Sequence, residues 1–174
     1  MKKTIIDLFE DSVAKYGAKT FLLEKRHRKF EPTTYAETRE QAIEVGAGLA
    51  SLGIRPQDKV AILAEGSNAW IISELGLFYA GAVSVPLSVK LEESNDLLFR
   101  LRHAEVRALF VLKYQLPKIR RIRQELPGVE HIVVFGHLPL EAGETAFGTL
   151  KRLGRDYLAK NREEFMRRGQ AIRN

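Results

Sequence analysis

The sequence predicts an α/β fold: a three-layer sandwich around a mostly parallel, doubly wound sheet, with an N-terminal helix and β-hairpin in front of it. Short apolar runs recur about every 24 residues between helical segments, at 59–63, 82–85, 107–112 and 131–135. Such spacing is typical of strand–helix–strand units in a parallel sheet. The runs show no polar–apolar alternation, which indicates strands that are covered on both faces.

The first 34 residues are predicted to form a helix and a hairpin. The helix runs from Thr4 to Lys15, with apolar residues at three- and four-residue steps, and Gly17 ends it. The segments 20–24 and 29–31 are predicted to pair as the two strands of a hairpin. We expect this hairpin to pack separately from the main sheet or at its edge.

A long helix is predicted from Thr34 to Leu52. Thr34 and Glu37 match a capping box, in which each side chain accepts a hydrogen bond from the backbone N–H of the other residue. Gly46 and Gly48 lie inside this helix although each costs roughly 1 kcal/mol relative to alanine, so we expect close backbone packing there. One face of the helix carries Tyr35, Thr38, Ala42, Val45, Leu49 and Leu52.

Helices are also predicted between the strands of the sheet. Residues 68–80 are almost wholly apolar, which indicates a buried helix with Trp70 in the core. The segments 92–103 and 117–126 are amphipathic, as expected for helices that cover one face of a sheet.

The apolar pattern weakens after Phe135. Residues 136–145 are predicted to form a loop and residues 149–168 a charged helix, and no further strand is expected. We therefore expect the segment 136–174 to be a loop and a charged helical tail that is partly disordered.

The composition excludes several classes of function. There is no cysteine, so disulfides, thiolate nucleophiles and cysteine-ligated zinc are excluded. No run of about 18 apolar residues is present, so no membrane-spanning helix is predicted. Asp7, Glu10 and Asp11 interrupt any signal-peptide core, and we expect a cytoplasmic protein.

Charge is distributed unevenly along the chain. Residues 1–98 carry 12 Lys/Arg and 14 Asp/Glu, whereas residues 99–174 carry 16 and 8, a net charge of +8. One interpretation is a free-standing basic α/β module that binds nucleic acid or another polyanion. Solvated helix faces explain the same charges, and the basic residues are not interleaved with aromatic ones. Nucleic acid is therefore not the expected partner.

Few residues match a pattern that carries chemistry. The loop Glu65–Asn68 precedes a helix, whose free N–H groups can hold an anion, but Ser67 or Asn68 can equally cap that helix. Gly143–Lys151 contains Gly, Thr and Lys in the wrong order for a phosphate loop. No histidine pair has metal-binding spacing, and no serine lies in a nucleophile elbow. We therefore assign no catalytic, cofactor-binding or metal-binding residue.

Three stretches, taken in order, resemble the opening of the adenylate-forming (AMP-binding) enzymes. They are Thr34-Tyr35-Ala36-Glu37, Gln57-Asp58-Lys59-Val60-Ala61-Ile62 and Ala80-Gly81-Ala82-Val83-Ser84-Val85-Pro86. The second is similar to the family's Gly-Asp-x-Val-Ala-Ile, with Gln57 in place of Gly. Long-chain fatty-acid–CoA ligases are the subgroup that three segments look closest to: the stretch at 80–86, Asn68-Ala69-Trp70, and Asn161-Arg162-Glu163-Glu164-Phe165.

The resemblance implies that residues 1–174 form the N-terminal subdomain of the large, adenylating domain of an acyl-CoA synthetase-like enzyme. Such ligases join a fatty acid to AMP using ATP and Mg²⁺ and then pass the acyl group to CoA. The resemblance places the phosphate loop, the adenine and ribose contacts and the catalytic lysine beyond Asn174. The fragment alone is therefore expected to bind no cofactor and to be structural and inactive.

The same resemblance implies the partners. They are the remainder of the same polypeptide and, in the full-length enzyme, fatty acid, ATP and CoA, with peripheral association with a membrane as a further hypothesis. A wall of the sandwich that normally packs on the rest of the enzyme would be uncovered in the fragment. Because monomers rarely expose large apolar patches, we expect the fragment to self-associate.

Overall fold

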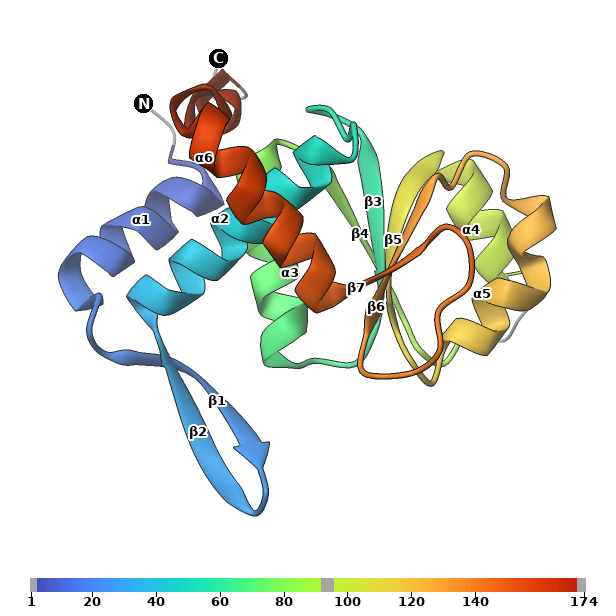
Figure 1. Ribbon diagram of the computed structural model, residues 1–174, viewed down its shortest axis with the longest axis horizontal. Coiled ribbons are helices and arrows are strands. Elements are labelled where there is room, and N and C mark those ends of the chain that lie inside the picture. The colour runs from blue at the N-terminus through green and yellow to red at the C-terminus, as the bar shows by residue number, and fades with distance from the viewer. Residues whose placement is uncertain (1–2, 92–95, 172–174) are drawn as a thin grey trace.

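The centre of the molecule is a five-stranded sheet in which all neighbouring strands are parallel (Figure 1). A computed structural model describes residues 3–91 and 96–171. The strand order is β4-β3-β5-β6-β7, which confirms the four predicted strands and their parallel pairing. The strands are β3 (Lys59–Leu63), β4 (Val83–Leu87), β5 (Val106–Leu112), β6 (His131–Phe135) and β7 (Glu144–Ala146).

Helices cover both faces of this sheet, as the predicted three-layer sandwich requires (Figure 1). One layer contains α2 (Tyr35–Ser51), α3 (Asn68–Ala80) and α6 (Phe147–Ala171), and the other contains α4 (Leu98–His103), α5 (Leu116–Ile122) and the short 3-10 helix η2 (Arg123–Glu125). Each face of the sheet has its own hydrophobic core, and alternate residues of a strand belong to the two cores because their side chains point to opposite faces. Val60 and Ile62 pack with the first layer, Ala61 and Leu63 with the second.

The N-terminal hairpin lies apart from the main sheet, as predicted, whereas the helix before it packs on α2 and α3 through Ile6 and Phe9. Helix α1 (Ile5–Tyr16) leads into β1 (Thr20–Arg26) and β2 (Lys29–Thr34), which pair antiparallel in a two-stranded sheet that extends away from the sandwich (Figure 1). An aromatic cluster holds its base: the Phe21 ring lies 4.4 Å from Tyr35 and 5.5 Å from Phe9, between ring centres.

Helix caps form where the sequence predicts them. Thr34 and Glu37 make the full capping box at the start of α2, and Thr4 and Asp7 make a second one at the start of α1. Each box satisfies two backbone N–H groups that a helix start leaves without partners. The predicted helix starts are therefore confirmed at both positions.

Glycines allow α2 to approach α3 and α6 at backbone distance, as expected for the helix containing Gly46 and Gly48. A Cβ on Gly46 would lie 2.5 Å from the carbonyl oxygen of Gly76 in α3, and one on Gly48 would lie 2.4 Å from that of Leu150 in α6. On the α6 side, a Cβ on Gly154 would lie 1.8 Å from the carbonyl oxygen of Glu44. These contacts offset the low helix propensity of glycine.

The prediction that no strand follows Phe135 is wrong. Residues 144–146 form β7, which pairs with β6, and α6 starts directly after it at Phe147. The short strand is held by a long-range contact, because Arg120 of α5 donates two hydrogen bonds to the Glu144 carboxylate at 2.9 and 2.7 Å. Partial disorder of the segment 136–174 stays a prediction.

Helix α6 is bent at Asn161, which has non-helical backbone angles (φ −132°, ψ 18°). The Asn161 side-chain amide donates to the carbonyl oxygen of Tyr157 at 3.0 Å, so it occupies an acceptor that an ordinary helical N–H would use. Beyond the bend, Phe165 is fully buried among residues of α2 and α3.

Two of the predicted helices differ in extent from the structure. The segment 117–126 corresponds to α5 and η2, which together span 116–125. The predicted helix 92–103 is described only in its second part, as α4, and residues 92–95 lie outside the described residues.

Candidate functional site

The carboxyl edge of the sheet carries the loops in which ligands of open α/β sheets usually bind. The loop after β3 leads to α3 on one face, and the loop after β5 leads to α5 on the other. Adjacent loops that leave in opposite directions mark the topological switch point of such a sheet. Here that point lies between the loop 64–67 and the loop 113–115.

The β3 loop is organised as a helix cap. The Ser67 hydroxyl accepts a hydrogen bond from the backbone N–H of Trp70 at 3.2 Å, so Ser67 serves the first turn of α3 as the capping interpretation predicts. Trp70 is half-buried and packs against the main core. Of the two interpretations of this loop, the contacts favour capping over an anion site.

The β5 loop carries a lysine and an exposed tyrosine at the switch point. The backbone N–H of Lys113 donates to the carbonyl oxygen of Phe135 at 2.9 Å, which ties this loop to β6. The Lys113 ammonium lies 4.9 Å from the centre of the Tyr114 ring, and Tyr114 is 73% exposed. Gly136 has φ +101° and would place a Cβ 2.8 Å from the Lys113 side chain, so glycine is needed there.

The segment Gly143–Lys151 does not form a phosphate loop. Thr145 lies in β7 and Gly148 in the first turn of α6, so strand and helix join with no loop between them. Lys151 donates to the Gln41 side chain at 3.0 Å and lies 5.4 Å from the Phe147 ring centre. Lys151 lines a polar hollow of about 360 Å³ between the hairpin, α2 and α3. It does not lie beside a loop of backbone N–H groups, as the lysine of a phosphate loop does.

The histidines lie in different parts of the fold. His27 is in the hairpin turn, His103 stacks on Phe99 with ring centres 5.3 Å apart, and His131 Nε2 lies 2.9 Å from the carbonyl oxygen of Leu52. Across residues 3–91 and 96–171, no group of three His, Cys, Asp or Glu side chains could hold a metal ion.

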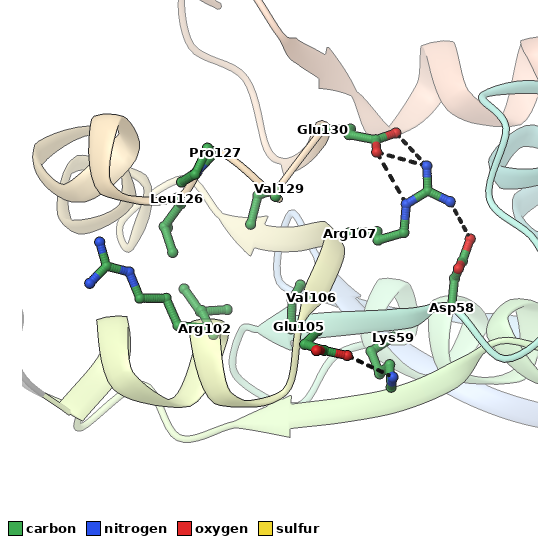
Figure 2. A pocket seen from close by; sticks show the side chains of 12 residues that line it. Asp58, Lys59, Arg102, Glu105, Val106, Arg107, Leu126, Pro127, Val129 and Glu130 are labelled. Atoms are coloured by element: carbon green, nitrogen blue, oxygen red, sulfur yellow. Dashed lines mark hydrogen bonds and ion pairs between the residues drawn. The ribbon is translucent and has the colours of Figure 1, made fainter.

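The opposite, amino edge of the sheet holds a larger hollow of about 580 Å³, shown in Figure 2. We call it the amino-edge groove. It lies between the end of α4, the starts of β3 and β5, and the chain that enters β6. Its lining residues are Asp58, Lys59, Leu101, Arg102, Glu105, Val106, Arg107, Leu126, Pro127, Gly128, Val129 and Glu130.

Most charges of the amino-edge groove are paired with each other. Arg107 donates to both carboxylate oxygens of Glu130, at 2.7 and 2.6 Å from Nη2, and to Asp58 at 2.7 Å from Nη1 (Figure 2). Hydrogen bonds from Arg107 lower the pKa of Glu130, and those to Glu130 raise the pKa of Arg107. Lys59 lies 3.4 Å from Glu105. The groove thus offers ion pairs but no nucleophile with an adjacent base.

The sequence alone identified neither the amino-edge groove nor the switch point. Both depend on which strand ends lie side by side, and Arg107 and Asp58 are 49 residues apart. The repeated apolar runs were the one signal that predicted a sheet with two such edges.

A family model described as "AMP-binding enzyme" matches residues 9–164 of the sequence. The chain belongs to the AMP-binding enzyme family. The match covers the N-terminal hairpin, the sheet and most of α6. It confirms the resemblance drawn from the motifs at 34–37, 57–62 and 80–86.

Curated relatives in this family are ligases. A chloroplastic long-chain-fatty-acid–[acyl-carrier-protein] ligase of Arabidopsis thaliana is 29% identical over 109 residues, covering 63% of this chain and 15% of the relative. A long-chain-fatty-acid–CoA ligase of Thermus thermophilus is 30% identical over 128 residues, covering 74% of this chain and 24% of the relative. The chain therefore spans less than a quarter of the length of these two proteins.

Solved structures of CoA ligases share the fold. The anthranilate CoA ligase AuaEII, crystallised with anthranoyl-AMP, matches with a TM-score of 0.77 and 31% identity, over 84% of this chain and 27% of that one. A long-chain-fatty-acid-CoA ligase from Archaeoglobus fulgidus matches with a TM-score of 0.75 over 88% of this chain and 30% of that one. At 20% identity, the second likeness shows the fold alone.

No helix within the described ranges 3–91 and 96–171 is both long and apolar enough to cross a membrane.

Proposed function

We propose that this chain is the N-terminal part of the adenylating domain of an ATP-dependent long-chain fatty-acid–CoA ligase. In the full-length enzyme a fatty-acid carboxylate attacks the α-phosphorus of ATP and releases pyrophosphate, with Mg²⁺ offsetting the phosphate charge. The thiol of CoA then attacks the acyl carbon and displaces AMP. The observation that carries the proposal is the family match over residues 9–164, together with relatives whose names specify long-chain fatty acids.

The role proposed for these residues is structural. The sandwich supplies one wall of the large domain, and its carboxyl edge is the edge at which ligands of open parallel sheets bind. Transfer of an adenylyl group requires donors aimed at the phosphates and a cation to offset their charge. Within the described ranges, Ser67 is committed to a helix cap and Lys151 to Gln41. We therefore infer that the 174-residue chain alone is inactive.

The acyl acceptor is the finer part of the proposal. One relative is named for acyl-carrier protein and the other for CoA. CoA is proposed because the motif at 161–165 and the Asn68-Ala69-Trp70 motif look closest to the CoA ligases. A cytoplasmic location, self-association of the fragment and peripheral contact with a membrane remain predictions that cell fractionation, sedimentation and vesicle binding can test.

The alternative of a free-standing polyanion-binding module has less support. It rested on the net positive charge of residues 99–174, but many arginines there are paired within the chain. Arg120 pairs with Glu144, Arg155 with Glu44 and Arg162 with Glu40. Binding of the pure chain to nucleic acid that weakens steeply with salt would favour this alternative.

ATP–pyrophosphate exchange tests the proposal. The full-length protein, read past Asn174, should show exchange that depends on a long-chain fatty acid, whereas the 174-residue chain should show only background. Exchange above background by the pure short chain would contradict its inactivity. Full-length protein that exchanges with no fatty acid would contradict the substrate.

A further inference from the structure

Arg102 and Arg107 stand at opposite ends of the amino-edge groove (Figure 2). Arg102 Nε donates to the backbone carbonyl oxygen of Glu125 at 2.9 Å, but its Nη2 lies 3.8 Å from the Glu125 carboxylate, beyond hydrogen-bond distance. Both Nη groups of Arg102 thus make no hydrogen bond within residues 3–91 and 96–171. A guanidinium offers five N–H donors in a rigid fork, and most of those on Arg102 remain available to a ligand.

The two arginines therefore differ in what they can bind. All three nitrogens of the Arg107 guanidinium donate hydrogen bonds: Nε and Nη2 to Glu130, and Nη1 to Asp58. Its donors are therefore largely occupied. Arg102 is 55% exposed and has one firm hydrogen bond, to a neutral carbonyl. A carboxylate suits the free side of Arg102, because arginine–carboxylate pairs form two parallel charge-assisted hydrogen bonds.

Between the arginines the groove has an apolar lining. Its floor is closed by Leu101, Val106, Leu126 and Val129, each at most 2% exposed. Leu126 is drawn beside the aliphatic stem of Arg102, with Pro127 beyond it (Figure 2). A ligand must therefore lie along the groove rather than enter the core. The volume of about 580 Å³ falls in the range of small-molecule sites.

We propose that the amino-edge groove binds a small apolar monocarboxylate, with its carboxylate on the Nη groups of Arg102 and its hydrocarbon part against Pro127 and the arginine stem. A single negative charge is preferred to a phosphate because Asp58, Glu105 and Glu130 line the groove and the Glu125 carboxylate lies 3.8 Å from Arg102. These carboxylates repel a multiply charged anion. The site lies at the amino edge of the sheet, opposite the carboxyl edge with its switch point, and does not depend on the proposed ligase activity.

Titration of the 174-residue chain with hexanoate tests the site. Two-dimensional ¹⁵N–¹H NMR should show saturable shifts of the amide signals of Val106, Gly128 and Val129. A ligand of roughly eight non-hydrogen atoms is expected to bind with a Kd of about 1 mM. Hexan-1-ol, which has the same chain and no charge, should bind about tenfold more weakly because it cannot form the paired hydrogen bonds.

Three variants separate the proposed contact from general charge effects. Arg102→Gln should raise the Kd for hexanoate about tenfold, and Glu125→Gln should lower it about twofold, since it removes a competing carboxylate. The matched control is Arg152→Gln, because Arg152 pairs with Asp156 on α6, outside the groove; its Kd should match that of the wild type.

Absence of saturable shifts for hexanoate in the wild type would overturn the proposal. So would equal affinity of the wild type and Arg102→Gln, or equal affinity for hexanoate and hexan-1-ol. Because Arg102 is half-exposed and makes no ion pair at hydrogen-bond distance, its variant should fold. The dispersion of its amide spectrum checks this directly.

Discussion

Replacing Gln57 with glycine should stabilise this protein, although it removes a whole side chain. Gln57 lies in the loop before β3 with φ +71°, and its side chain is exposed. A residue with a Cβ in this left-handed region is strained by roughly 1–2 kcal/mol. The backbone N–H of Gln57 donates to the carbonyl oxygen of Gly81 at 2.8 Å, a hydrogen bond that glycine retains.

The size of the effect is a difference between two terms. Glycine relieves the strain, but it adds roughly 0.4–1 kcal/mol of conformational entropy to the unfolded chain. With both terms at their midpoints, the net gain in the free energy of unfolding is about 0.8 kcal/mol. In chains of about 150–250 residues, 1 kcal/mol shifts Tm by about 2–4 °C. Gln57→Gly should therefore raise Tm by about 1–4 °C.

Thermal unfolding followed by circular dichroism measures this shift, with two control variants. Gln57→Ala keeps the Cβ and should gain nothing. Gly53→Ala introduces a Cβ at φ +88°, where no atom lies within 4 Å. Its strain of about 1–2 kcal/mol is partly offset by the lower entropy of the unfolded chain, so the net loss should be about 0.8 kcal/mol. If Gln57→Gly lowered Tm while Gly53→Ala left it unchanged, left-handed strain would not govern these positions and the reasoning would fail.

Other substitutions address packing and acid stability. Gly154→Ala should destabilise the fold by about 1–3 kcal/mol or more, because the new Cβ would lie 1.8 Å from the Glu44 carbonyl oxygen. The control is Gly148→Ala in the same helix, where the new Cβ meets nothing within 4 Å. Urea unfolding should show this control to be neutral or stabilising. Hydrogen bonds from Arg120 lower the pKa of Glu144. That stabilisation is present above the unfolded pKa of about 4.3 and is lost as pH falls through the lower folded pKa. Glu144→Gln should therefore flatten the acid side of a plot of unfolding free energy against pH.

Each of these predictions has an outcome that contradicts it. Equal loss of stability in the two alanine variants of α6 would mean that helix propensity, and not the contact with α2, sets their effect. An unchanged acid limb in Glu144→Gln would mean that the pair with Arg120 contributes equally to the folded and unfolded states.

The sheet was predictable because each of its main strands is a run of consecutive apolar residues, which can be recognised from the local sequence. The run at 108–112 is apolar on both faces and can be recognised without knowledge of distant residues. The strand β7 was missed because Glu144-Thr145-Ala146 is short and half-buried, and its position depends on Arg120, 24 residues earlier. The glycines of α2 were interpreted correctly, since a costly residue inside a helix indicates a close neighbour.

The candidate sites were less predictable than the fold. The spare donors of Arg102 follow from the distance of Glu125, and no sequence spacing fixes a side-chain distance of 3.8 Å. The sequence shows that Gln57 stands where the family pattern has glycine. The backbone strain that this causes is apparent only from its φ of +71°. Contacts between distant segments, and not propensity, decide these features.

The glycine contacts between α2 and α6 also govern when the protein can complete its fold during synthesis. Lys151 reaches Gln41 across 110 residues of sequence, and Arg155 reaches Glu44 across 111. Translation from the end of α2 to Phe165 takes on the order of 10 s at typical rates. During that time the part of α2 that receives α6, at Glu44 and Gly48, has no partner in the growing chain, although α3 can already pack on Gly46.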